Sequence, residues 1–169
     1  MATRLLLLAD THVPRRARAL PAAVRRAASE ADLIVHAGDW VDGSVLDELG
    51  ALGPVLGVWG NNDGDDLRSR LPEVARAEIE GVRVAVVHET GASAGREARM
   101  DAAFPDTDLL VFGHSHIPWD TVTPRGLRLL NPGSPTDRRR QPACTLMTAT
   151  LVDGDIRDVE LREVSRSAG

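Results

Sequence analysis

The segment LLVFGHSH (residues 109–116) contains the pattern around which the rest of the chain is organised. Its first half, residues 109–112, is a continuous apolar run that ends at a glycine, which predicts a buried β-strand. The two histidines after the glycine, His114 and His116, stand two residues apart, so both imidazoles can point the same way. Neutral imidazole is the commonest metal ligand in proteins. The segment therefore predicts a strand that carries two candidate metal ligands at its carboxyl end.

Four earlier apolar segments end in a similar way, each followed by side chains that can bind a metal. The segments span residues 4–9, 32–37, 54–59 and 82–87. The candidate ligands that follow them are Asp10, His12, Asp39, Asn61 and His88. In open α/β sheets, ligands bind at the carboxyl ends of the strands. We therefore expect these side chains to form a single site together with His114 and His116.

The order of the predicted elements indicates an α/β fold. Helices are predicted over residues 21–31, 44–52 and 65–71, with Ser44 as the N-cap of the second helix. This alternation of strands and helices is typical of parallel strands joined by right-handed crossovers.

After Pro72 the pattern changes to pairs of short strands joined by turns. The predicted hairpins are 75–79 with 82–87, 119–122 with 127–130, and 144–152 with 156–162. A further helix is predicted over residues 93–103. We therefore predict one domain over residues 1–169, with a parallel half, an antiparallel half and two packed sheets covered by helices.

Composition and charge argue against several classes of protein. The formal charge is −5, and residues 138–140 form the longest basic run, which argues against a nucleic-acid partner. Cys144 is the single cysteine, so no intrachain disulfide can form and a reducing compartment is expected. No apolar segment approaches the ~20 residues needed to cross a bilayer. We expect a cytoplasmic protein without a membrane partner.

The candidate ligands are too many for one divalent ion. They comprise four imidazoles and three carboxylate or amide groups, a set that suits two ions sharing one carboxylate. Nitrogen and oxygen ligands without a thiolate favour Mn²⁺, Fe²⁺, Co²⁺, Ni²⁺ or Zn²⁺ over Ca²⁺ or Mg²⁺, and Mn²⁺ is our first choice. Two ions ~3.5–4 Å apart can hold a hydroxide and stabilise both sides of an in-line displacement at phosphorus.

In order along the chain, the motifs are Asp-x-His, Gly-Asp, Gly-Asn-x-Asp, a single His and Gly-His-x-His. This order resembles the calcineurin-like metallophosphoesterase superfamily. The small size of the chain and the Asn-Pro-Gly-Ser turn at residues 131–134 are similar to its compact YfcE-like phosphodiesterase branch. The resemblance extends from Leu5 to at least Ser134, which is nearly the whole chain.

The resemblance implies a four-layer α/β/β/α sandwich of two mixed sheets with a dinuclear metal site at one end. By the matching motif positions, one ion would be held by Asp10, His12, Asp39 and His116. The other would be held by Asp39, Asn61, His88 and His114, with Asp39 as the bridge. A water bridging the two ions would attack phosphorus, so Asp39, Asn61 and His88 would act through the metals, without a covalent enzyme intermediate.

One position departs from the pattern of the superfamily. Many members have a histidine directly after the ligand asparagine, placed to protonate the leaving group or stabilise the transition state. Here that position is Asn62, whose amide can donate a hydrogen bond but cannot act as an acid. General acid catalysis typically contributes ~10²–10⁴-fold to a rate. The YfcE-like branch usually lacks this histidine too, so Asn62 favours a phosphodiesterase and counts against a phosphomonoesterase.

Several polar residues near these motifs have a simpler explanation than a catalytic role. His36 lies inside a predicted strand, so its side chain alternates away from the strand end and we interpret it as packed. Glu89 either bonds a ligand histidine or faces solvent, and we expect the second; Asp63 is expected to brace the glycine-asparagine loop. Arg15 and Arg16 are candidates for binding a phosphoryl oxygen, although a solvated helix entry is the simpler interpretation.

We therefore predict a metal-dependent phosphodiesterase that acts on a small organic phosphodiester. A phosphomonoesterase or a nuclease of the same superfamily is the alternative within enzymes. A non-catalytic interaction scaffold is the alternative of another class, because the resembling retromer subunit uses this fold in that way. Every expected ligand position is filled here, which favours the enzyme. The oligomeric state is open, with a homo-oligomer as one option.

Overall fold

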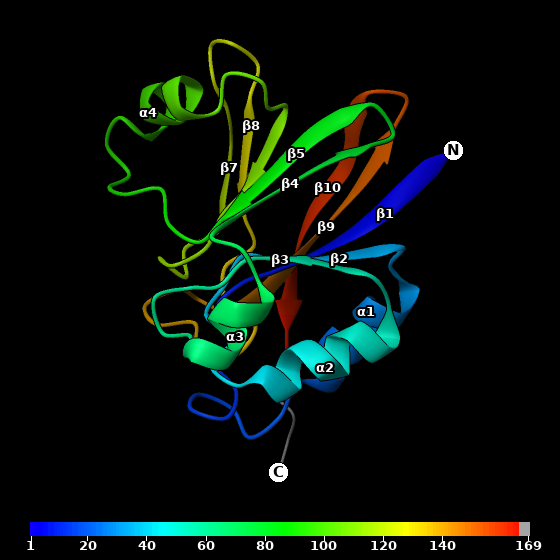
Figure 1. The fold of residues 1–169 in the computed structure, drawn as a ribbon, viewed down its shortest axis with the longest axis vertical. Helices are drawn as coiled ribbons and strands as arrows, with labels where there is room; N and C mark the ends of the chain where they lie inside the picture. Colours follow the sequence, from blue (N-terminus) through cyan, green and yellow to red (C-terminus); the bar gives the residue numbers. More distant parts are fainter. Residues whose placement is uncertain (166–169) are drawn as a thin grey trace.

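The computed structural model describes residues 1–165, which form two five-stranded sheets packed face to face (Figure 1). The first sheet contains, in spatial order, β10 (Asp155–Val164), β9 (Cys144–Val152), β1 (Ala2–Leu8), β2 (Leu33–His36) and β3 (Val55–Gly57). The second contains β4 (Val74–Ile79), β5 (Val82–Val87), β6 (Leu109–Val111), β8 (Arg128–Asn131) and β7 (Trp119–Val122). The helices are α1 (Ala22–Glu30), α2 (Gly43–Leu52), α3 (Asp65–Arg70) and α4 (Arg96–Ala103).

Three hydrophobic layers hold the sheets and helices together. Leu5 and Leu7 of β1 point into the space between the sheets, where they join a core that includes Val86 of β5. Leu6 and Leu8 point the other way and pack under α1, α2 and α3. On the outer face of the second sheet, α4 covers a third apolar cluster. The fold is therefore the predicted four-layer α/β/β/α sandwich, and the second half of β1, Leu5 to Leu8, is apolar because both of its faces are covered.

Both sheets are mixed. The strands β1, β2 and β3 are parallel to one another, and so are β5, β6 and β8. The antiparallel half of the sequence does not form a sheet of its own, because β9 returns to the first sheet and pairs antiparallel with β1. β2 pairs with one edge of β1, and β9 provides hydrogen-bond partners for the main chain at the other edge. An unpaired edge at this position would be a site of aggregation.

The turns of the structure confirm one predicted hairpin and correct the predicted starts of two helices. The Glu80-Gly81 turn has φ angles of 50° and 79°, as the predicted hairpin requires. The N-cap of α2 is Asp42 rather than Ser44, because the Asp42 carboxylate accepts a hydrogen bond from the Ser44 amide at 2.9 Å. The helix predicted from residue 93 begins only after Gly95, which has a left-handed φ of 71°.

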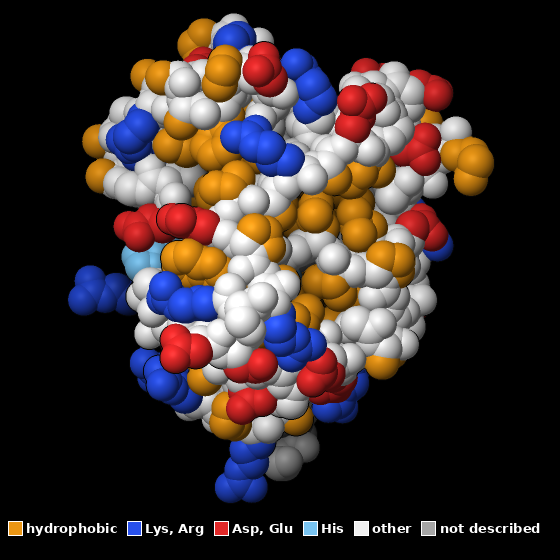
Figure 2. Space-filling view, viewed as in Figure 1, with side chains coloured by type: hydrophobic (Ala, Val, Ile, Leu, Met, Phe, Trp, Pro, Cys, Tyr) orange, Lys and Arg blue, Asp and Glu red, His pale blue; other side chains and the backbone are white. Residues whose placement is uncertain are grey.

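The distribution of charged side chains on the surface agrees with the absence of a long basic run in the sequence. On the face shown in Figure 2, acidic and arginine side chains are interspersed around exposed apolar patches, without a continuous basic stripe. Within residues 1–165, no helix combines the length and the apolar composition needed to cross a membrane.

The corrected N-cap gives a prediction for stability. Replacing Asp42 by alanine removes the acceptor for the Ser44 amide, so we expect the free energy of unfolding to fall by about 1 kcal/mol. Ser44→Ala is the matched control, with an expected change of less than about 0.5 kcal/mol. Urea unfolding followed by circular dichroism measures both, and a larger loss for Ser44→Ala would contradict the assignment.

Candidate metal centre

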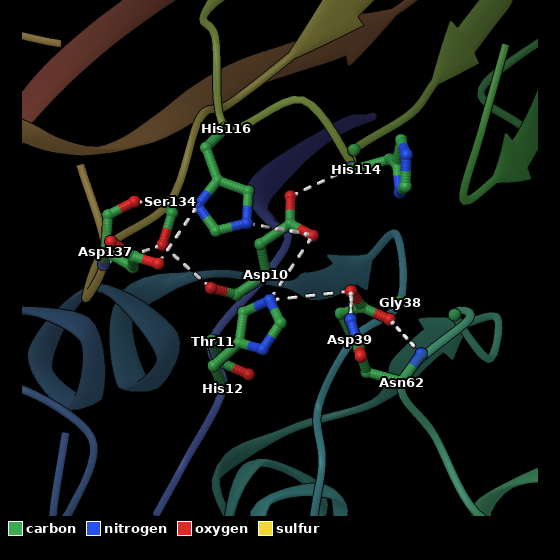
Figure 3. Close-up of polar contacts among 12 residues, drawn as sticks. Asp10, Thr11, His12, Gly38, Asp39, Asn62, His114, His116, Ser134 and Asp137 are labelled. Carbon is green, nitrogen blue, oxygen red and sulfur yellow. Dashed lines mark hydrogen bonds and ion pairs between the residues drawn. The ribbon is translucent and has the colours of Figure 1, made fainter. Parts of the chain in front are cut away.

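Seven polar side chains from both sheets meet where parallel strands end, and Figure 3 shows much of this network. They follow β1, β2 and β3 of the first sheet and β5 and β6 of the second. They are Asp10, His12, Asp39, Asn61, His88, His114 and His116. The structure thus brings together every residue that the sequence placed in one site, while their role as metal ligands stays a prediction.

Most of these residues have an unusual backbone conformation. The angle φ is positive at Asp10 (54°), His12 (43°), Asp39 (60°), His114 (73°) and His116 (61°). For a residue with a Cβ this conformation costs about 1–2 kcal/mol, and such residues are concentrated at functional sites. Main-chain hydrogen bonds hold the turns, because Asp10 N donates to Gly38 O at 2.9 Å and His12 N donates to Asp39 O at 3.1 Å.

Two glycines of the motifs are required by close packing. Gly38 has a φ of 94°, and a Cβ at this position would lie 2.8 Å from His88 Nδ1. A Cβ on Gly60 would overlap the carboxylate of Asp39. Gly38 therefore lets the loop after β2 approach His88 of the second sheet, and Gly60 lets the loops after β2 and β3 of the first sheet approach each other.

Asp10, His12 and His116 form a buried cluster whose polar atoms face one another without a hydrogen bond. Asp10 Oδ1 lies 3.9 Å from His12 Nε2 and 3.7 Å from His116 Nε2. Only four buried side-chain nitrogen or oxygen atoms within residues 1–165 lack a hydrogen-bond partner, and these three are among them. Leaving such an atom unpaired costs about 1–3 kcal/mol. A cation between the three atoms would satisfy them all.

Burial changes the protonation of this cluster. It raises the pKa of the Asp10 carboxyl to about 8, against the opposing charge of His88. It lowers the pKa of His116 to about 4 and also lowers the pKa of His12, and the charge of Arg139 lowers both further. The two imidazoles are thus neutral at physiological pH, which is the form that binds metals. A bound cation would favour the ionised form of Asp10.

Main-chain carbonyl groups orient two of the imidazoles. His88 Nδ1 lies 2.7 Å from Ala37 O, and His116 Nδ1 lies 2.7 Å from Asp137 O. A carbonyl oxygen only accepts hydrogen bonds, so each Nδ1 carries the proton and donates it. In the neutral rings Nε2 is then free to act as a ligand, directed at the other site residues.

Asn61, His88 and His114 form a second cluster at the more exposed side of the site. Asn61 Oδ1 lies 2.9 Å from His88 Nε2 and 3.1 Å from His114 Nδ1. In a neutral His88, Nε2 and the amide oxygen are both acceptors, so a proton or a cation must lie between them. Burial lowers the pKa of His88, but the carboxylates of Asp39 and Asp10 outweigh burial and raise it above its usual value.

Asp39 lies between the two clusters. Its Oδ2 is 3.4 Å from His12 Nε2 and 3.4 Å from His88 Nε2. Burial opposes ionisation of this carboxyl, but contacts with His88 and Asn62 hold its pKa well below the usual range. One ionised oxygen is therefore placed near ligand nitrogens of both clusters.

This arrangement fits divalent metal binding. The groups Asp10–His12–His116 and Asp10–Asp39–His88 each offer three ligand atoms that lie within 4.8 Å of one another, and all of these residues are buried. Burial removes competing water, and the donor set contains nitrogen and oxygen without sulfur, which suits first-row transition metals.

Two residues that we interpreted as structural pack behind the site. His36 is fully buried and its ring stacks on Trp40, with 3.6 Å between centroids. Asp63 is also buried, and its carboxylate accepts hydrogen bonds from three main-chain amides, those of Asp39, Val41 and Gly60. Asp63 therefore joins the loops after β2 and β3, as expected from the sequence.

Three charged residues close in sequence to the ligands have different surroundings. Glu89 is exposed, as expected, but its carboxylate also lies 3.8 Å from His114 Nε2. Arg15 is exposed, and Arg16 Nε lies 3.4 Å from the carboxylate of Asp137. The suggested contact of Arg15 and Arg16 with a substrate stays a prediction.

Sequence reasoning missed how residues 134–137 support the site. Ser134 Oγ donates a hydrogen bond to Asp10 O at 2.7 Å, and Thr136 Oγ1 donates one to Thr11 O at 2.6 Å. Asp137 O then orients His116, as described above (Figure 3). The Asn-Pro-Gly-Ser turn was the only sequence signal for this segment, and it gave no indication of which residues the segment contacts.

Comparison with known proteins identifies a family. The sequence matches the calcineurin-like phosphoesterase superfamily domain over residues 3–154. It is 36% identical over 162 residues to a probable metallophosphoesterase of Methanothermobacter thermautotrophicus, covering 92% of this chain and 89% of that protein.

Solved structures share the fold at lower identity. Vacuolar Protein Sorting 29 of Cryptosporidium parvum superimposes with a TM-score of 0.77 at 20% identity, covering 98% of this chain and 99% of that one. A novel archaeal phosphodiesterase gives a TM-score of 0.68 at 18% identity, covering 94% and 99%. The family match spans nearly the whole chain and confirms the resemblance drawn from the motifs. This chain belongs to the calcineurin-like phosphoesterase superfamily.

Proposed function

We propose that the protein is a dinuclear metal-dependent phosphodiesterase that hydrolyses a small organic phosphodiester. The observation that carries this proposal is the convergence of three buried, unpaired ligand atoms, from Asp10, His12 and His116, beside the ionised carboxylate of Asp39. Most buried side-chain polar atoms in proteins are hydrogen-bonded, so three unpaired ones that face one another favour a bound cation.

The proposed ligand sets follow the two clusters. Asp10, His12, Asp39 and His116 would hold one ion, and Asp39, Asn61, His88 and His114 would hold the other. Two divalent ions bound in this way, with Mn²⁺ as our first choice, supply a water of lowered pKa and positive charge for the oxygens on phosphorus. The chain contributes the orientation of the ligands through the carbonyl groups of Ala37 and Asp137.

Three features favour a small diester over a monoester or a polynucleotide. Asn62 occupies the position of the usual proton donor and has no acidic proton to give. The net charge of −5 and the mixed charge of the surface disfavour a polynucleotide. The fold is one that an archaeal phosphodiesterase also has, so it accommodates diester chemistry.

Arg139 is the arginine that we propose for substrate binding. It is exposed, has a left-handed φ of 49°, and follows Asp137, whose carbonyl group contacts His116. Its positive charge lowers the pKa of Asp10, His12 and His116, and we infer that the same charge attracts an anion to the site. Arg138, in contrast, donates a hydrogen bond to Gln141 O in its own loop.

The proposed activity is tested with two esters. With saturating Mn²⁺, we expect kcat/KM for bis-p-nitrophenyl phosphate to exceed that for p-nitrophenyl phosphate by at least about tenfold, which is about 1.4 kcal/mol in transition-state stabilisation. A faster monoester would indicate a phosphomonoesterase. Metal binding without hydrolysis of either ester would instead support a non-catalytic scaffold.

The shared role of Asp39 is tested by Asp39→Asn. Mn²⁺ at about 100 times its dissociation constant should stabilise the wild type by about 2.7 kcal/mol, which is about 5–10 °C in Tm for a chain of this size. The variant should lose this shift together with hydrolysis, because the amide carries no charge to share. Asp106→Asn, an exposed carboxylate remote from the site, is the control. A variant that retained the full Tm shift and turnover would rule out a bridging Asp39.

The role of Arg139 is tested by Arg139→Ala. We expect kcat/KM for the diester to fall by about tenfold, mainly through KM, because one charge-assisted contact of about 1.4 kcal/mol is lost. Arg138→Ala is the neighbouring control and should leave KM unchanged. Equal effects of the two substitutions would point to general electrostatic attraction instead.

A further inference from the structure

Asn62 makes two hydrogen bonds to the carboxylate of Asp39 (Figure 3). Its main-chain amide donates to Asp39 Oδ1 at 2.9 Å, and its side-chain amide donates to Asp39 Oδ2 at 2.7 Å. One residue thus contacts both oxygens of the carboxylate, and the shorter bond goes to the oxygen that lies between the two clusters. The side chain of Asn62 is directed at Asp39 from the loop after β3, 23 positions away in sequence.

The orientation of this carboxylate has to be set by such contacts. Asp39 has a left-handed backbone, and its own amide donates to the carboxylate of Asp63 at 2.9 Å, which fixes the main chain but leaves the side-chain torsions free. The nearest imidazole nitrogens, on His12 and His88, are 3.4 Å from Oδ2, beyond a good hydrogen bond. Within residues 1–165, the hydrogen bonds to this carboxylate therefore come from Asn62.

We propose that Asn62 is a positioning residue, whose side-chain amide holds Asp39 Oδ2 at the point shared by the two metal clusters. The proposal rests on the dinuclear function above and assigns to Asn62 a role different from that of the histidine found at this position in many relatives. That histidine would act on the leaving group, whereas the amide of Asn62 acts on a metal ligand. Outer partners that orient a metal ligand typically change metal affinity ~10–100-fold when removed.

The same geometry narrows the class of substrate. The Nδ2 group of Asn62 is directed at Asp39, and an amide has no proton to transfer near neutral pH. Asn62 therefore does not protonate the oxygen of the leaving group. Esters whose leaving group is stable as an anion, such as aryl or enol diesters, fit this site better than simple alkyl diesters.

Asn62→Ala tests the positioning role by metal affinity rather than by turnover. The substitution keeps the main-chain bond to Oδ1 and removes only the side-chain bond to Oδ2. Titration of the metal-free protein with Mn²⁺ in a calorimeter should show affinity weakened by about 10–100-fold relative to wild type. Because Asn62 is exposed, the urea midpoint of the metal-free variant should stay close to that of wild type. Asp65→Asn, three positions further along the chain, is the control and should match wild type in both measurements.

The outcomes separate the positioning role from the proposed function. If the wild type binds Mn²⁺ and Asn62→Ala binds it within about twofold as tightly, Asn62 does not position Asp39, and the dinuclear function stands. Asn62→Ala could also bind Mn²⁺ more weakly and lose, in the metal-free form, as much free energy of unfolding as it loses in binding free energy. That result would show a merely structural role and would also overturn the inference. If the wild type binds no Mn²⁺, the proposed function fails and the inference fails with it.

The substrate class is tested with a set of aryl and alkyl diesters. The ratio of kcat/KM for aryl esters to kcat/KM for alkyl esters should be smaller for Asn62→His than for the wild type.

Discussion

The buried carboxylate of Asp10 connects the two sheets, and the geometry of the site depends on it. Its Oδ2 accepts a hydrogen bond from the main chain of His114, which follows a strand of the second sheet. The main chain of Asp10 bonds Gly38 on one side and the hydroxyl of Ser134 on the other. Its remaining oxygen, Oδ1, has no hydrogen-bond partner among residues 1–165 and faces two imidazoles. One residue thus fixes loops from both sheets while its free oxygen points into the site.

The site is costly for the chain to maintain without a cation. Five of its residues are held with positive φ, and three buried atoms have no hydrogen bond. Each of these features destabilises a fold by about 1–3 kcal/mol. They occur together at the carboxyl ends of the strands. The strands themselves are packed in the buried core, so they can hold the strained loops in place. A bound cation would satisfy the unpaired atoms and stabilise the ionised form of Asp10.

The sequence was sufficient for the layers and for the composition of the site, because both depend on local patterns. Apolar runs at residues 5–9 and 84–87 marked β1 and β5, and the ligand pairs Asp10-x-His12 and His114-x-His116 came just after strands. The sheet to which β9 belongs was not predictable, because its pairing depends on which strand far away in sequence has a free edge. The Asn62–Asp39 contact and the support from residues 134–137 join distant segments. The N-cap of α2 was misplaced by two residues because Asp42 and Ser44 are both good capping residues.

The central claim is that two metal ions share Asp39, and anomalous diffraction from crystals soaked in Mn²⁺ tests it most directly. The account predicts two anomalous peaks ~3.5–4 Å apart, one beside Asp10, His12 and His116 and the other beside Asn61, His88 and His114, with Asp39 Oδ2 in contact with both. A single peak, or none at saturating Mn²⁺, would contradict it.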